Sequence, residues 1–260
     1  MRLLQHTRLE ARRCRWILLP DQYQLLITDQ LPLPWDEMAQ AMRWKVKDLL
    51  EYPLEDVVLD LFPIPPFGTK KQQKKAGVVV ARKSWIETML TYFEEAFLLV
   101  ETIDVADLAL CHIIEYCAKT PTVALLHIEP QMGKLLIWHE GNVYLIRQLA
   151  WHHRIGNAQD TQLLLETLLE ELQRSFHYCE AELKLGPIRQ LLLTPNENAE
   201  VTVNFLRQHL SVPVIYPDFN DIFHSKASLP TSVQQELLYS MGGVFPLLEK
   251  QPVKAYATED

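Results

Sequence analysis

Histidine and cysteine side chains are the first candidates for chemistry in this chain. His152 and His153 are adjacent, and His177 and Cys179 follow further along. A structural zinc site needs four such ligands at short, regular spacings, whereas neighbouring residues of a helix or strand point in different directions. The sequence also contains no Gly-x-Ser-x-Gly motif and no phosphate-binding P-loop. These residue types therefore predict neither a metal site nor a catalytic site.

A basic run at residues 70–75 lies in a loop between two expected strands. A solvated loop tip is its default interpretation. The alternative is a contact with an acidic protein or with anionic headgroups, where each lysine contributes about 1 kcal/mol. The chain as a whole carries a formal net charge of −8, which opposes nonspecific binding to nucleic acid or anionic lipid. We therefore expect no nucleic-acid partner.

The four cysteines are widely spaced and form no Cys-x-x-Cys pair; they are Cys14, Cys111, Cys117 and Cys179. Reduced thiols of this kind are typical of cytoplasmic proteins. No stretch reaches the roughly 20 apolar residues of a membrane-spanning helix, and the start lacks the apolar segment of a signal peptide. These features predict a cytoplasmic protein that reaches a membrane only through a partner.

Hydrophobic periodicity predicts alternating strands and helices, and hence an α/β protein. Two short apolar runs on either side of Pro20 predict a β-hairpin over residues 15–28. An amphipathic helix follows over residues 34–50, and Trp44 is displaced from its apolar stripe. The elements expected next are strands at 57–63, 77–82 and 98–103 and helices at 84–97 and 105–117. The helix at 84–97 is expected to direct four apolar side chains inward: Ile86, Leu90, Phe93 and Phe97.

The pattern changes at Pro121. Strands at 123–128, 134–139 and 143–149, with a turn at Gly141, predict an antiparallel meander. The longest helix is expected at 160–179. Further elements are strands at 188–194 and 212–216 and helices at 199–210 and 231–248, the last interrupted or capped at Gly242 and Gly243.

Residues 44–63 form the most specific segment of the chain, with the sequence WKVKDLLEYPLEDVVLDLFP. This segment resembles the signature of the MshI proteins of the mannose-sensitive haemagglutinin (MSHA) pilus. More broadly it resembles the PilM family, whose relatives include FtsA and the cytoplasmic part of the type II secretion protein GspL. The similarity continues through shorter segments at 78–83, 103–110, 141–149, 172–176 and 239–245, and so covers roughly residues 14 to 250.

The resemblance implies an actin-like (ribonuclease H-like) α/β fold. Such a fold has two domains around a cleft; here it would carry an inserted small α+β subdomain and would lack the first N-terminal strands. The expected divisions are 1–24 as a remnant of the first subdomain, 25–103 as the insert, 104–120 as a helix of the first subdomain, 121–230 as the second domain and 231–260 as the C-terminal helix and tail.

Family members that bind ATP hold the phosphates with two Asp-Gly hairpins and place the adenosine beside a Gly-Gly turn. The first hairpin has no counterpart here. In the second, His127 stands near the expected Asp and Glu129 near the expected Gly, while residues 194–196 replace the Gly-Gly turn. A side chain blocks the close backbone approach that glycine permits, and a carboxylate repels phosphate. We therefore expect no catalytic residue, no cofactor, and a degenerate nucleotide site near His127, Glu129, Gly133, Thr194 and Asn196.

By the same resemblance, the chain is a non-catalytic scaffold for type IV or MSHA-type pilus assembly, peripheral to the inner membrane. It would bind a cytoplasmic peptide of a PilN/MshJ-like inner-membrane protein, in a groove between the insert and the first subdomain. The candidate lining residues are Trp44, Lys47, Asp48, Tyr52 and Phe62. Core burial is the alternative for Trp44. Two other functions stay open: a weak ATP-binding ATPase, and a GspL-like adaptor for the cytoplasmic assembly ATPase.

Overall fold

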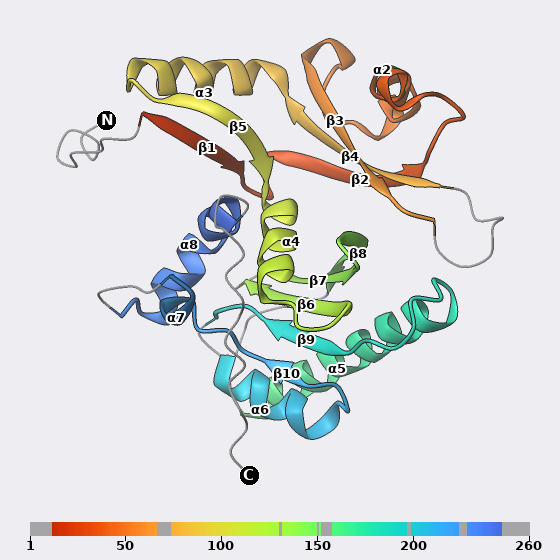
Figure 1. Ribbon diagram of the computed structural model, residues 1–260, viewed down its shortest axis with the longest axis vertical. Coiled ribbons are helices and arrows are strands. Elements are labelled where there is room, and N and C mark those ends of the chain that lie inside the picture. Colours follow the sequence, from red (N-terminus) through yellow and green to blue (C-terminus); the bar gives the residue numbers. More distant parts are fainter. Residues whose placement is uncertain are drawn as a thin grey trace.

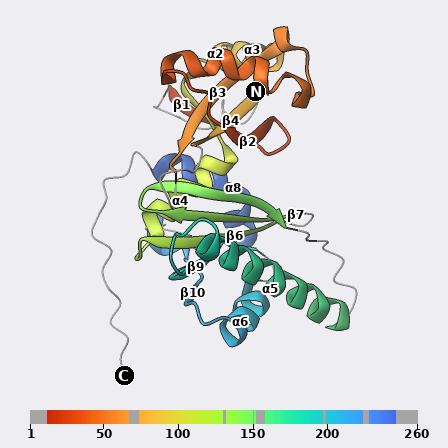
Figure 2. The same ribbon diagram turned by 90° about the vertical axis from the view of Figure 1, so that its right-hand side faces the viewer.

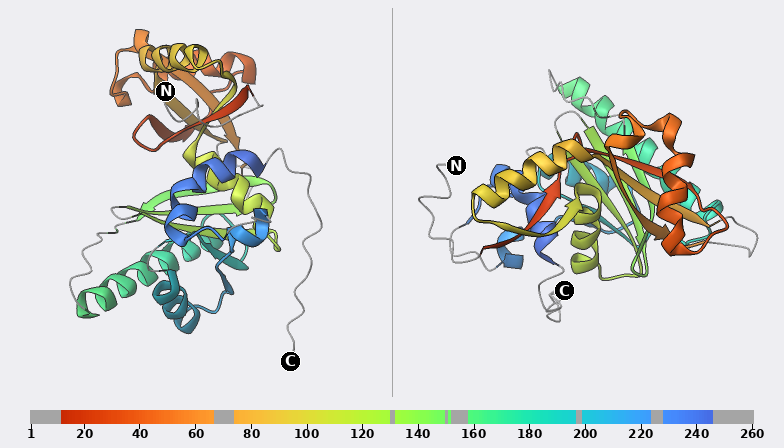
Figure 3. Two further views of the ribbon diagram at one scale, coloured as in Figure 1. Left: turned by 90° about the vertical axis from the view of Figure 1, so that its left-hand side faces the viewer. Right: turned by 90° about the horizontal axis from the view of Figure 1, so that it is seen from above.

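The computed structural model describes residues 12–66, 74–129, 132–149, 151, 158–196, 199–223 and 228–245. These residues form two lobes (Figure 1). The upper lobe holds two small sheets, and the lower lobe is a five-stranded sheet with helices on both faces (Figure 2). The helices α4 (Ala106–Cys117) and α8 (Thr231–Val244) lie at the junction of the two lobes (Figure 3).

The upper lobe is built on two sheets of different kinds. β1 (Arg13–Leu18) pairs in parallel with β5 (Leu99–Val105). A separate antiparallel sheet has β4 (Lys75–Arg82) between β2 (Tyr23–Asp29) and β3 (Val57–Ile64). One face of this sheet is covered by α2 (Trp35–Lys45), which is followed by the short 3-10 helices η1 (Lys47–Leu49) and η2 (Leu54–Asp56). α3 (Lys83–Glu95) packs on β1, where Trp16 contacts Trp85 and Phe93.

The expected hairpin over residues 15–28 is wrong. β1 and β2 follow each other in sequence but pair with different strands, because Trp16 and Leu18 pack into a cluster with residues of α3 and α4. The expected insert at 25–103 contains the β2–β4–β3 sheet apart from the first two residues of β2, whereas β5 pairs outside it. Its boundaries remain predictions.

The lower lobe contains the antiparallel meander that the sequence predicts. It is formed by β6 (Thr122–Glu129), β7 (Met132–His139) and β8 (Asn142–Leu149). β9 (Gln190–Leu193) pairs in parallel with β6, and β10 (Val214–Ile215) with β9. One face is covered by α5 (Ala158–Ala181) and α6 (Ala199–His209), and the other by α4, α8 and the short α7 (Phe219–Phe223). α7 was not among the expected helices. β6 is central and buried on both faces.

Two local expectations differ from the structure. α8 was expected to be interrupted or capped at Gly242 and Gly243, but it continues through both glycines to Val244. A Cβ at Gly242 would lie 2.3 Å from the carbonyl oxygen of Ala109 on α4. Glycine therefore permits a close contact between two helices rather than a break. Phe97, expected on the inward face of α3, follows the helix at a positive φ and is 78% exposed.

Candidate functional site

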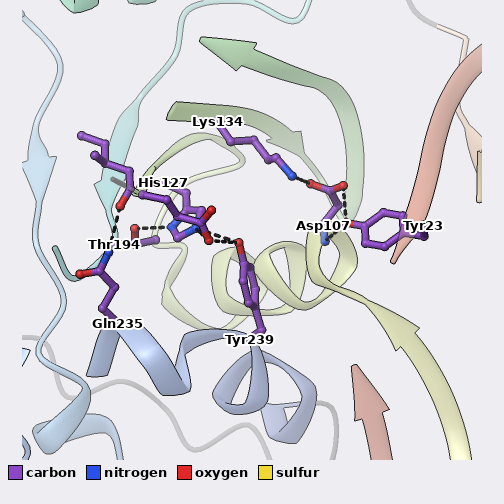
Figure 4. A network of polar contacts seen from close by, with 9 residues as sticks. Tyr23, Asp107, His127, Lys134, Thr194, Gln235 and Tyr239 are labelled. Carbon is purple, nitrogen blue, oxygen red and sulfur yellow. Dashed lines mark hydrogen bonds and ion pairs between the residues drawn. The ribbon is translucent and has the colours of Figure 1, made fainter. Parts of the chain in front are cut away.

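A buried polar cluster lies where β6 and β9 end (Figure 4). His127 on β6 is 1% exposed, and its Nδ1 lies 2.8 Å from Oγ1 of Thr194, which directly follows β9. Its Nε2 lies 2.9 Å from the hydroxyl oxygen of Tyr239 on α8 and 3.1 Å from Oε1 of Glu129. Parallel strands end at one edge of a sheet, which is where ligands bind in open α/β folds. We call these four residues the His127 network.

Hydrogen bonding sets the charge of this network. The Tyr239 hydroxyl donates to Oε1 of Glu129 at 2.6 Å. The hydrogen bond from His127, assisted by the one from Tyr239, holds the pKa of the Glu129 carboxyl below its usual value despite partial burial. Burial raises the pKa of Tyr239, so that its hydroxyl stays a donor. Glu129 is therefore an anion at neutral pH, held in place by hydrogen bonds with His127 and Tyr239.

The residues of this corner do not fit a nucleotide phosphate. Both ring nitrogens of His127 are occupied by protein groups, and the carboxylate of Glu129 repels an anion. The side-chain amide of Asn196 donates to the carbonyl oxygen of Thr194 at 3.1 Å, which closes the turn after β9. A Cβ at Gly133 would lie 3.3 Å from Cβ of Leu149, its register partner, so this glycine permits a close contact between β7 and β8.

Metal ligation has no support in the described part of the chain. No group of three or more metal-ligating side chains occurs there. His152 and His153 lie outside the described residues, and so do residues 70–73 of the basic run.

A second buried network joins the two lobes (Figure 4). The hydroxyl of Tyr23 on β2 donates to Oδ2 of Asp107 at 2.7 Å, and Nζ of Lys134 on β7 donates to Oδ1 of the same carboxylate at 2.6 Å. Asp107 and Lys134 are 3% and 7% exposed, so the ion pair is shielded from water. We call this the Asp107 network. No sequence pattern predicts this network, because its members come from three separate elements.

A cleft between the lobes, here named the junction cleft, has a volume of about 250 Å³. Its lining residues come from β3, α4 and the β7–β8 turn; they are Phe62, Pro63, Leu108, Cys111, His112, Glu115, Trp138, Gly141, Asn142 and Val143. An adjoining hollow of about 390 Å³ shares Glu115, Trp138 and Gly141 with it. Burial raises the pKa of the Cys111 thiol, which therefore stays protonated and is not a nucleophile.

The structure does not bring the five candidate peptide-binding residues into one site. Trp44 is 68% exposed at the end of α2, and Nζ of Lys47 lies 6.0 Å from the centre of its ring, with Asp48 next to it in η1. The Arg82 guanidinium lies 5.2 Å from the ring centre of Tyr52.

Phe62 lies in the junction cleft, apart from the other four candidates. Its neighbour Leu61 faces α2, so Phe62 points to the opposite face of the sheet and into the junction cleft. Of the five candidates, Phe62 is the one that lines this cleft.

No protein-family model and no curated protein sequence matches the chain. Among solved structures, it is similar to a chain of the "PilM-PilN type IV pilus biogenesis complex", with a TM-score of 0.67 and 18% identity over 96% of this chain and 83% of that one. The fold is actin-like. This confirms the fold class that the sequence resemblance implies.

Weaker likenesses accompany this one. The cytoplasmic domain of EpsL from the type II secretion system of Vibrio cholerae gives a TM-score of 0.46 and 13% identity, over 90% of this chain and 75% of that one. A Bacteroides thetaiotaomicron protein with an actin-like ATPase fold gives 0.48 and 10%, over 91% and 78%. In the described part of the chain, no helix combines the length and apolarity that a membrane crossing needs.

Proposed function

We propose that the chain is a non-catalytic scaffold of type IV pilus assembly, of the MSHA type or a related secretion system. In this role it binds an extended cytoplasmic peptide of a PilN-like inner-membrane protein, and this partner holds it at the membrane. The observation that carries the proposal is the likeness of nearly the whole chain to the structure of the PilM-PilN complex. The His127 network supports a role without nucleotide chemistry, because protein side chains occupy both ring nitrogens of His127.

The walls of the junction cleft suit a peptide better than a cofactor. Its volume of about 250 Å³ lies below the roughly 300–1,000 Å³ of typical small-molecule sites. Phe62, Leu108 and Trp138 offer apolar surface for one inserted side chain, and the adjoining hollow along Trp138 and Gly141 continues the path. An extended peptide crossing both depressions anchors one apolar residue between the lobes.

Titration calorimetry of the whole chain with a synthetic peptide tests this proposal. The peptide carries the cytoplasmic N-terminal sequence of the PilN-like partner. We expect micromolar binding, and a loss of about tenfold or more in Phe62→Ala, which removes one wall of the cleft. Trp44→Ala is the matched control, because it removes an exposed aromatic ring outside the cleft and leaves the affinity unchanged.

The two other functions give different results in the same experiment. A weak ATPase binds ATP with magnesium at micromolar affinity, whereas the residues around Glu129 predict no such binding. An adaptor for the assembly ATPase is retained by that motor in a pull-down and not by the membrane partner. A folded protein with no affinity for the peptide contradicts the proposal.

A further inference from the structure

α3 ends in a turn that places a phenylalanine where glycine is the usual residue. The amide of Leu98 donates to the carbonyl oxygen of Phe93 at 2.9 Å, and the amide of Phe97 to that of Glu94 at 2.9 Å. These two bonds define a Schellman motif, whose left-handed position here is Phe97 with a φ of 59°. A bulky side chain at this position strains the backbone, which glycine does not.

Within the described part of the chain, little of the Phe97 ring is buried to offset this strain. It is 78% exposed, the highest value among the exposed large hydrophobic residues of the described chain. Leu99, two residues further on, is 58% exposed. A strained backbone that presents an unburied aromatic ring points to a contact with another molecule.

The charges beside this ring are of both signs. The carbonyl oxygen of Arg12 accepts from the amide of Leu99 at 2.6 Å, and Arg13 is the register partner of Leu99. Glu94 and Glu95 are exposed in the last turn of α3, directly before Phe97. Arg13 also pairs with the exposed Glu101 of β5 at 3.0 Å. The arginine side of the apolar centre therefore keeps one positive charge in excess, and the end of α3 carries two negative charges. The ends of α3, β1 and β5 that form it meet at the left of the upper lobe in Figure 1.

This charge pattern selects the kind of partner. The two glutamates repel an anionic membrane, and the paired signs offer no preference for a uniformly acidic or basic peptide. The pattern is self-complementary, because a two-fold axis through the apolar centre places the arginines of one copy against the glutamates of the other.

We propose that the surface formed by Arg12, Arg13, Glu94, Glu95, Phe97 and Leu99, the Phe97 surface, pairs with the same surface of a second copy of the chain. Phe97 and Leu99 form the apolar centre of this contact, and charge pairs surround it. This inference is independent of the peptide proposed for the junction cleft, whose lining residues it does not use.

Sedimentation of the purified chain over a concentration series tests the pairing. We expect a reversible dimer, and a dissociation constant at least roughly tenfold higher in Phe97→Gly. The same variant relieves the backbone strain, so its unfolding midpoint rises by about 2–4 °C. Weaker association in a more stable protein excludes misfolding as the cause. Trp44→Ala, which removes an exposed ring elsewhere, leaves association unchanged. A wild type that stays monomeric, or a Phe97→Gly variant that associates as the wild type does, overturns the proposal.

A charge exchange tests the orientation of the two copies. Variant one carries Arg12→Glu and Arg13→Glu, and variant two carries Glu94→Arg and Glu95→Arg. Each alone brings like charges together and is expected to be monomeric, whereas an equal mixture restores opposite charges and forms a mixed dimer. Failure of the mixture to associate, with both variants folded by circular dichroism, contradicts the two-fold arrangement.

Discussion

At the scale of single residues, the side chains of the His127 network satisfy one another's hydrogen bonds where β6 and β9 end. His127 is the centre, because each of its ring nitrogens has a partner from a different element. In a site that held phosphate, backbone amides would face an open space. Here a hydroxyl from α8 and a hydroxyl after β9 contact the His127 ring, which makes this polar cluster part of the core.

Replacing His127 by Ala is expected to lower the free energy of unfolding by about 2–4 kcal/mol, because Thr194, Glu129 and Tyr239 lose their common partner in a buried setting. Thr194→Val is the control of similar shape and removes one hydrogen bond, for a loss of about 1 kcal/mol. Urea unfolding followed by tryptophan fluorescence measures both. Equal, small losses in the two variants are incompatible with a central role of His127.

The depressed pKa of Glu129 has a consequence at acidic pH. The folded chain binds the proton of this carboxyl less tightly than the unfolded chain does, so the unfolded state holds more protons and stability rises with pH. Its contribution is complete above the unfolded pKa of about 4.3 and is lost as pH falls through the lower folded value. Denaturant unfolding at pH 3 to 7 should therefore show a shallower acid loss in Glu129→Gln than in the wild type. Parallel pH profiles would refute this.

At the scale of elements, local pattern predicts some pairings and not others. The β6–β7–β8 meander follows from alternating strands and the turn at Gly141, which has a φ of 88°. The pairing of β1 with β5 joins strands on either side of the whole β2–β4–β3 sheet, and nothing local encodes it. α7 is too short to show a helical period.

The candidate site was likewise predictable from the sequence only in part. The sequence resemblance pointed to His127, Glu129 and Thr194, which the structure does bring together. It gave no role to Tyr239, because the contact depends on how closely α8 approaches the sheet. That approach is set by Gly242 against Ala109, a steric fact that no periodicity expresses.

A Cβ at Gly242 should force α8 away from α4. We expect Gly242→Ala to destabilise the chain by about 1–3 kcal/mol, although alanine is the better helix former. Ser240→Ala, an exposed position of the same helix, changes stability by less than about 0.5 kcal/mol. Thermal unfolding of the two variants side by side decides this, and a stabilised Gly242→Ala variant would show that the helices are not in tight contact.

At the scale of the whole molecule, a buried charge pair with a hydroxyl beside it joins the lobes, together with an apolar cluster that has members in both lobes. The Asp107 network spans β2 of the upper lobe, α4 at the junction and β7 of the lower lobe. The junction cleft opens between the same lobes, at the other side chains of α4. The relative position of the lobes, and hence the width of the cleft, therefore depends on Asp107.

Removing one charge of this network should cost more than removing both. Lys134→Met leaves Asp107 buried without a counter-charge, for an expected loss of about 3–5 kcal/mol. Adding Asp107→Asn removes the unpaired charge and should recover part of that loss. A double-mutant cycle in urea measures the coupling, and strictly additive effects would show that the two side chains act independently.

The most direct test of the central claim is hydrogen–deuterium exchange on the whole chain, with and without the cytoplasmic peptide of the PilN-like partner. We expect slower exchange in β3 around Phe62, in α4 and in the β7–β8 turn, and no change in α2 around Trp44. Addition of ATP with magnesium should leave the amides around His127 and Thr194 unchanged. Protection of these amides by ATP, or peptide protection confined to α2, would contradict the role of a peptide-binding scaffold without nucleotide chemistry.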